Sequence, residues 1–183
     1  LVALLGDWLR GRGHDVDRRA GPHVDGVRGV DVGIVSGDRR PPASRPVDAA
    51  ALAQDVVSTA SSLPEAEGIT FDVRADDQVP AVMADEDAIR RALHNLIGNA
   101  LKYAADGRWI GVTISRGAGR DEGLVLMAVS DRGRGIPPAE LPHIFDPFYR
   151  GRFALDRQIH GNGLGLSLVK RIAEAHGGRI SVK

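Results

Sequence analysis

The sequence contains no cysteine, few aromatic residues and no excess of either charge. The absence of cysteine excludes disulfides, thiolate metal sites and cysteine nucleophiles. The 24 basic side chains are balanced by 24 acidic ones, so bulk electrostatic binding to nucleic acid is not expected. No apolar run approaches the roughly 18 residues that span a bilayer, and no secretory signal is recognisable.

The remaining composition is that of a globular domain. Of 183 residues, 43% are hydrophobic and 26% are charged, and a chain of this length buries roughly 70% of its unfolded surface. Because the ends, Leu1 and Lys183, look cut, we interpret the chain as part of a longer protein with a truncated last strand. Glycine and proline interrupt residues 1–46, which we interpret as a leader, a linker or the remnant of an upstream region. Residues 47–183 form the predicted domain.

Periodicity predicts mixed α and β structure in this domain. Helices are expected at residues 49–61, with Asp48 as N-cap, at about 86–103 and at 164–176. Strands are expected at residues 69–73, 79–83, 109–115, 124–129 and 179–182, with a weak candidate at 30–35 in the leader. An irregular stretch runs from 131 to about 162. This order favours an α+β fold, a two-layer sandwich in which helices cover one face of a sheet.

The helix at 86–103 carries an unusual polar stripe. Asn95, Asn99 and Lys102 fall opposite its apolar face on a wheel of about 100° per residue. Asparagine is a poor helix former, and a merely solvated face would favour Glu, Lys or Gln. Amide oxygens suit Mg²⁺, and an ammonium suits phosphate. The stripe is a candidate phosphate and metal site, and a plain solvated face is the alternative.

Two glycine-containing segments are candidates for the rest of a nucleotide site. Asp131 follows an apolar strand and precedes Gly133 and Gly135, which offers an acceptor for an exocyclic amine beside accessible backbone; a simple turn is the alternative. The segment GNGLGL at residues 161–166 opens a helix, where free N–H groups and the dipole favour an anion. It matches neither the P-loop nor the Rossmann spacing, and a flexible helix start is the alternative.

Residues 138–160 separate these two segments and read as a lid. They hold four of the six Phe and Tyr residues, together with three arginines. A loop this long inside a compact domain is usually functional or disordered. Aromatic anchors and arginines fit a lid that closes over phosphate, and a packed Ω-loop is the alternative.

Together and in this order, the four segments resemble the nucleotide-binding boxes of sensor histidine kinases, which share an ATPase superfamily with DNA gyrase, Hsp90 and MutL. Residues 95–103 (NLIGNALKY) resemble the N box and residues 131–136 (DRGRGI) the G1 box. Residues 145–150 (FDPFYR) resemble the F box and residues 161–166 the G2 box. The likeness covers about three quarters of the chain, residues 46–183.

The resemblance implies a Bergerat-type fold, a mixed sheet backed by three main helices and closed by an ATP lid, with ATP and Mg²⁺ as cofactors. It implies that Asn99 binds Mg²⁺, that Asn95 and Lys102 act with it in catalysis, and that Asp131 accepts from the adenine amine. The other positions that it implies to contact nucleotide are Tyr103, Gly133, Gly135, Ile136, Phe148, Arg150, Gly161, Gly163, Leu164, Gly165 and Leu166.

The sequence differs from the family pattern at two points, and both bear on the expected activity. Gyrase-like ATPases carry a glutamate base where this chain has Asn95, and an amide cannot take a proton at neutral pH, so phosphoryl transfer is favoured over hydrolysis. No His-Glu-Leu-Arg-Thr-Pro-like acceptor box is present. The resemblance therefore implies, as partners, a histidine-containing dimerisation domain of the same protein and a response regulator.

It further implies a homodimeric parent anchored in the inner membrane, with this domain in the cytoplasm. Two alternatives stay open: a serine kinase of the anti-sigma-factor type, and a nucleotide-binding pseudokinase module that signals by conformation.

Overall fold

The structure, a computed structural model, describes residues 28–35, 41, 43–77, 79–103, 107–117 and 123–182, with the backbone alone for 28–35. Its elements are β1 (Arg28–Val35), β2 (Arg45–Val47), α2 (Ala49–Ser61), the 3-10 turn η1 (Pro64–Ala66), β3 (Thr70–Ala75), β4 (Val82–Ala84), α3 (Glu86–Tyr103), β5 (Trp109–Arg116), β6 (Leu124–Asp131), α4 (Arg152–Asp156), α5 (Gly165–Ala175) and β7 (Arg179–Val182). The rest of the expected leader, residues 1–27, 36–40 and 42, lies outside the described residues.

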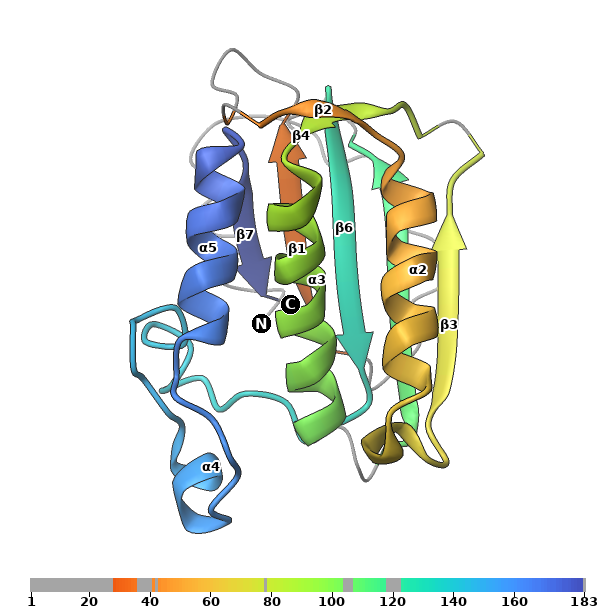
Figure 1. The fold of residues 1–183 in the computed structure, drawn as a ribbon. Helices are drawn as coiled ribbons and strands as arrows, with labels where there is room; N and C mark the ends of the chain where they lie inside the picture. Colours follow the sequence, from red (N-terminus) through yellow and green to blue (C-terminus); the bar gives the residue numbers. More distant parts are fainter. Residues whose placement is uncertain are drawn as a thin grey trace, which may run out of the picture.

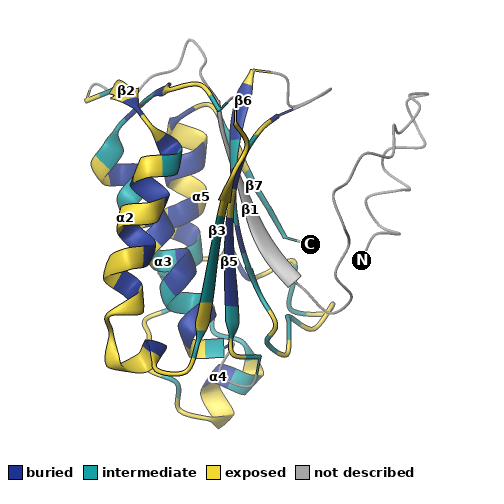
Figure 2. Cartoon of the chain, turned by 90° about the vertical axis from the view of Figure 1, so that its right-hand side faces the viewer, coloured by how far each residue is buried: buried dark blue, intermediate teal, exposed yellow. Residues whose placement is uncertain are grey.

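A five-stranded mixed sheet forms one layer of the molecule (Figure 1). Its strands lie in the order β3-β5-β6-β1-β7. The pair β3–β5 is parallel, and the other three neighbouring pairs are antiparallel. α2, α3 and α5 form the second layer and cover one face of this sheet, as the side view in Figure 2 shows. The expected two-layer α+β fold with three main helices is therefore confirmed.

The hydrophobic core lies between these two layers. Ile89, Leu93 and Ile97 are spaced one turn apart on α3 and are almost completely buried, because residues at i and i+4 share one face of a helix. Ile110 and Met127 come up to them from the sheet. Burial of each such side chain contributes roughly 1.5–3 kcal/mol relative to exposure. The buried stripe turns the opposite face of α3, with its asparagines, away from the core.

Residues at the helix boundaries set where α2 begins and where α5 ends. The Asp48 carboxylate accepts hydrogen bonds from the amides of Ala50 and Ala51, so the expected N-cap of α2 is confirmed. α5 ends before Gly177, whose φ of +70° is the left-handed conformation that favours glycine. None of the described helices is both long and apolar enough to cross a membrane.

β1 extends the sheet into the stretch that the sequence analysis assigns to the leader. The strand candidate at residues 30–35 is confirmed, and it runs from Arg28 to Val35 between β6 and β7. Val32, for example, pairs with Met127 on β6 and with Ile180 on β7. The expected boundary after residue 46 thus does not coincide with the edge of the sheet. Two glycines and an aspartate interrupt the β-branched residues of this strand, so its sequence signal is weak and its place depends on the strands that flank it.

Two further details differ from the expectation. The irregular stretch at 131–162 contains the short helix α4, which is too short to give a helical periodicity. The expected strand at 79–83 is β4, shifted to Val82–Ala84, and it pairs with β2 in a separate two-stranded sheet. Both differences lie in segments of three to five residues, where neighbouring contacts outweigh local propensity.

The position of β1 can be tested with a proline. Because β1 is hydrogen-bonded to a strand on each side, Val32→Pro should lower the free energy of unfolding by about 3 kcal/mol or more, since proline removes a ladder donor. Val32→Ala keeps the amide and serves as the matched control. Denaturant titration of both variants measures the difference, and equal stabilities would show that residue 32 is not in a central strand.

Candidate functional site

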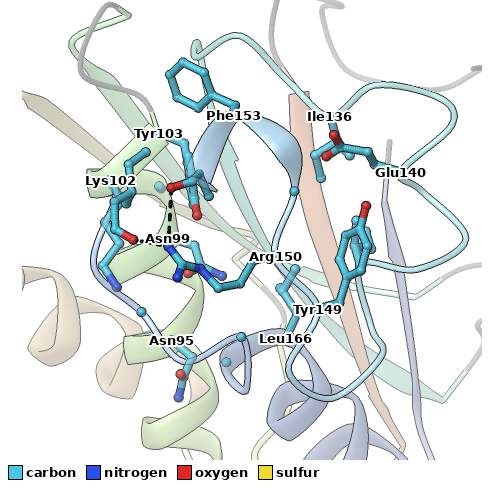
Figure 3. Close-up of a pocket in the computed structure, with 18 of the residues that line it drawn as sticks. Asn95, Asn99, Lys102, Tyr103, Ile136, Glu140, Tyr149, Arg150, Phe153 and Leu166 are labelled. Carbon is cyan, nitrogen blue, oxygen red and sulfur yellow. Dashed lines mark hydrogen bonds between the residues drawn. The ribbon is translucent and has the colours of Figure 1, made fainter. Parts of the chain in front are cut away.

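A pocket lies where the second half of α3 meets the loop after β6, the lid and the start of α5 (Figure 3). Its volume is about 260 Å³, near the lower end of ligand pockets, which hold roughly 300–1,000 Å³. All four sequence segments that resemble nucleotide-binding boxes contribute to it. The expected site residues that line it are Asn95, Asn99, Lys102, Tyr103, Asp131, Gly135, Ile136, Arg150, Gly161, Gly163, Gly165 and Leu166.

Three expected residues, Gly133, Phe148 and Leu164, do not line the pocket. Gly133 lies behind it, packed against the end of α3. Phe148 is 72% exposed and has a φ of +64°. Leu164 occupies the position before α5. In the structure these three residues shape the backbone around the pocket and do not form its wall.

The polar stripe of α3 faces the start of α5. The Asn95 side chain donates from Nδ2 to the carbonyl oxygen of Arg91 at 2.8 Å, which leaves its Oδ1 turned toward Gly165. A Cβ at Gly165 would lie 3.0 Å from that oxygen and 3.8 Å from Asn99 Nδ2. Glycine at this position therefore lets the first residue of α5 come into contact with both asparagines. The sequence predicts the stripe, and the structure supplies its partner.

The loop after β6 is built by a carboxylate and two glycines. Asp131 is the last residue of β6, and its Oδ1 accepts from the Gly133 amide at 2.7 Å. A Cβ on Gly133 would overlap the carbonyl oxygen of Tyr103 and lie 2.8 Å from Asp131 Oδ1. Gly135 has a φ of +70°. These glycines bring the loop against the last turn of α3, so that Asp131 and Tyr103 line the same pocket.

The start of α5 carries backbone donors with no side-chain cap. Leu164, at the N-cap position, makes no capping side-chain hydrogen bond. The first N–H groups of a helix have no intrahelical partner, and the helix dipole adds partial positive charge there. Lys102 brings an ammonium to the same region, with Nζ 3.9 Å from where a Cβ of Gly161 would lie. This end of the pocket is suited to an anionic group such as phosphate.

The lid is held over the pocket by polar and cation–π contacts. Arg150 donates from Nη2 to the carbonyl oxygens of Ala154 at 3.3 Å and Ile159 at 2.7 Å, and thus joins α4 to the segment after it. The Arg134 guanidinium lies 3.8 Å from the centre of the Phe153 ring. Glu140 Oε1 accepts from the Arg152 amide at 3.1 Å, which caps the start of α4.

These contacts assign roles that the sequence did not indicate. Arg134, Glu140 and Phe153 line the pocket and fix the lid. The aromatic content of residues 138–160 was a signal for Phe153 alone. Arg150, expected to approach phosphate, is engaged with lid carbonyls in this structure. Burial raises the pKa of the Tyr103 phenol, with Arg150 acting weakly against it. The phenol is therefore a neutral hydroxyl at pH 7.

The site offers few metal ligands of its own. Among the described residues, no three His, Cys, Asp or Glu side chains cluster in a way that could hold a metal ion. Asn99 lines the pocket, and its side chain has one amide oxygen that a hard cation could use. Mg²⁺ commonly takes one or two protein ligands and completes its shell with water and substrate phosphates. The donor set is compatible with Mg²⁺ that arrives with a nucleotide, and not with a metal site formed by protein alone.

Known proteins are similar to this chain in sequence and in fold. Residues 84–183 match the family of histidine kinase-, DNA gyrase B-, and HSP90-like ATPases. The sensor histidine kinase YkoH of Bacillus subtilis (strain 168) is 40% identical over 111 residues, 61% of this chain and 23% of that protein. The full-length ShkA crystal structure, in complex with AMPPNP, is 29% identical, covers 80% of this chain and 31% of that chain, and has a TM-score of 0.61.

The mycobacterial sensor histidine kinase MprB is similar to a comparable degree. Its structure is 28% identical, covers 73% of this chain and 80% of that chain, and has a TM-score of 0.60. The chain spans between 16% and 37% of the length of the curated relatives it matches. The likeness thus concerns one domain of longer proteins.

Substitutions of two glycines, Gly133 and Gly98, test the packing around the end of α3. Gly133→Ala should lower the free energy of unfolding by roughly 1–3 kcal/mol, because its Cβ overlaps backbone atoms of α3. Gly98→Ala is the matched control: it lies within α3 with nothing within 4 Å of the new Cβ, and it should stabilise the chain by roughly 0.5–1 kcal/mol. Thermal unfolding of both variants measures whether each substitution lowers or raises the free energy of unfolding. A neutral Gly133→Ala would contradict the close approach.

Proposed function

Because the chain belongs to the histidine kinase-, DNA gyrase B- and HSP90-like ATPase family, we propose that it is the ATP-binding catalytic domain of a sensor histidine kinase. It binds Mg-ATP and donates the γ-phosphoryl group to a histidine on a dimerisation domain of the same protein. The observation that carries this proposal is the meeting of the Asn95–Asn99 stripe with the uncapped start of α5 across one pocket. The relatives are named sensor histidine kinases, which does not favour the serine-kinase and pseudokinase alternatives.

Adenine is proposed to occupy the inner part of the pocket, beside Asp131. One carboxylate oxygen of Asp131 is held by the Gly133 amide, so the orientation of the side chain is set before a ligand binds. A carboxylate accepts from the exocyclic amine of adenine and has no donor for the carbonyl that guanine carries in its place. Ile136 and Ile144, which also line the pocket, provide apolar surface for the faces of the base.

The triphosphate is proposed to lie between Lys102 and the start of α5. The ammonium and the uncapped amides act on the same anion, from α3 and from the loop before α5. Asn99 is the proposed ligand of Mg²⁺, which neutralises phosphate charge when bound. The lid, through the Arg134–Phe153 stack, whose residues both line the pocket, would help to exclude water from it.

The side chain of Asn95 favours transfer over hydrolysis. Its Nδ2 is a donor to the carbonyl of Arg91, and its amide oxygen is not basic at neutral pH. Asn95 would thus put an amide, not a carboxylate, at the turn of α3 where the resemblance to gyrase-like ATPases expects a base that activates water. An imidazole from an acceptor domain does not need that base to the same degree, because a neutral imidazole is itself nucleophilic near neutrality.

The remaining parts of the proposal concern the parent protein. We propose that the acceptor histidine passes its phosphoryl group to a response regulator, that the parent is a homodimer, and that this domain works in the cytoplasm. The names of the relatives support the two-component context, whereas the homodimer and the cytoplasmic location rest on the family resemblance. The chain itself spans only a minor part of the relatives' length.

Nucleotide selectivity tests the Asp131 contact. Asp131→Asn should weaken ATP binding by roughly 1–3 kcal/mol, because an amide presents a donor to the adenine amine, and should narrow the preference for ATP over GTP. Asp146→Asn, in the exposed lid and outside the pocket lining, is the matched control and should bind as the parent chain does. Titration calorimetry with a non-hydrolysable ATP analogue and Mg²⁺ measures both. No heat from the folded parent chain would overturn nucleotide binding.

Phosphoryl transfer tests the assignment as a kinase. With γ-labelled ATP, the chain alone should hydrolyse slowly and not label itself, whereas a separately expressed histidine-containing domain of the same protein should become labelled. Asn99→Ala should abolish labelling, because it removes the proposed metal ligand. Asn95→Glu should raise hydrolysis by introducing a base. Fast hydrolysis by the unaltered chain, or strong self-labelling, would contradict the proposal.

A further inference from the structure

A buried histidine lies at the end of α5, away from the pocket. His176 is 2% exposed, and among the described residues only Ser167 is another buried polar side chain. It does not line the nucleotide pocket. A buried imidazole is retained at little cost only when both ring nitrogens have partners. Both nitrogens of His176 do.

The two partners fix the protonation state of the ring. The backbone N–H of Asp85 donates to Nε2 at 3.0 Å, and the carbonyl oxygen of Ile172 lies 2.8 Å from Nδ1. An amide N–H can only donate and a carbonyl can only accept. The ring therefore carries its single proton on Nδ1 and is neutral, since a proton on Nε2 would remove the acceptor that Asp85 uses.

His176 thereby caps two helices at once. Asp85 precedes α3, where its side chain accepts from the Ala88 amide at 3.0 Å. In a capping box, the side chain at the position of Ala88 returns an acceptor to the amide of the capping residue. Alanine cannot do this, and His176 Nε2 supplies that acceptor from another helix. Through Nδ1 the same ring adds a second hydrogen bond to the Ile172 carbonyl in the last turn of α5, which also accepts from the His176 backbone amide.

This double cap joins the two helices that form the phosphate end of the pocket. α3 and α5 lie side by side and run in opposite directions (Figure 1). At one end of the pair, Gly165 abuts Asn95; at the other, His176 holds Asp85. Contacts at both ends of α5 oppose a slide of this helix along α3. A slide of even a fraction of the 5.4 Å helical pitch would move the uncapped amides of α5 relative to Asn95.

We propose that His176 is a positioning residue that sets the axial register of α5 against α3, and thereby the approach of Gly165 to Asn95 and Asn99. Its effect on nucleotide affinity rests on the proposed function. Its tautomer and its bond to Asp85 do not, so the two ideas can fail separately.

The experiment compares three variants of the full chain. His176→Leu removes both hydrogen bonds, whereas His176→Gln keeps an acceptor oxygen at about the reach of Nε2. Val169→Ala creates a cavity in α5 at a fully buried position without touching Asp85, and it controls for lost stability. Affinity for an ATP analogue with Mg²⁺ is measured by calorimetry where unfolding curves show each variant folded.

His176→Leu should weaken nucleotide binding by roughly tenfold, one decade in the dissociation constant, whereas His176→Gln and Val169→Ala should stay close to the parent chain. In His176→Leu alone, the Asp85 amide should exchange faster and the Asn95 side-chain amide signals should shift. Affinities that simply follow stability across all three variants would reduce His176 to a structural residue and overturn the proposal.

Nitrogen NMR of the unaltered chain provides a test that needs neither nucleotide nor a folded variant. The His176 ring should show a protonated Nδ1 and an unprotonated Nε2. The opposite tautomer, or a doubly protonated ring at neutral pH, would overturn the proposal. If the unaltered chain shows the expected tautomer but binds no nucleotide, the proposed function fails while the Asp85 contact stands.

Discussion

The close approach of α5 to α3 is the constraint on which the rest of the site depends. Glycine at position 165 favours it, because a Cβ there would lie only 3.0 Å from Asn95 Oδ1. A site for a polyphosphate needs backbone amides and side-chain donors within reach of the same oxygens, and here they come from two different helices. The buried stripe of α3 packs in the core against the sheet. The opposite side of the same helix lines the pocket.

Several parts of the site are shaped by missing side chains rather than by those present. Gly133 lets the loop after β6 touch the end of α3, and Gly163, with a φ of +71°, lets the loop before α5 pass beside Phe148. The lid, in contrast, is held by side chains acting on backbone or rings, notably Arg150, Glu140 and the Arg134–Phe153 stack. Few of its apolar groups are buried, and segments with this balance open at low free energy. A pocket that admits and releases a ligand needs a lid that opens more easily than the packed helices α3 and α5 move apart.

Asn95 and His176 make different contacts at the two ends of the α3–α5 pair. Asn95 combines an amide that is bound to its own helix with an oxygen that faces α5, and it has no basic group to activate water. His176 serves the opposite end of the same helix pair without touching the pocket. The pocket-lining Asn95 and the Asp85–His176 contact thus lie at different positions along α3.

The sequence alone determined what is local. The caps of α2 and α5, the buried stripe of α3, the asparagines opposite it and the four glycine- or aromatic-containing segments are all encoded by spacing within a few residues, because a helix or turn is specified by near neighbours. Only the tertiary structure decided the place of β1 between β6 and β7, the exposure of Phe148, the Arg134–Phe153 stack and the bond from Asp85 to His176, 91 positions apart. These contacts depend on which surfaces meet once the layers pack, and no periodicity within a segment carries that information.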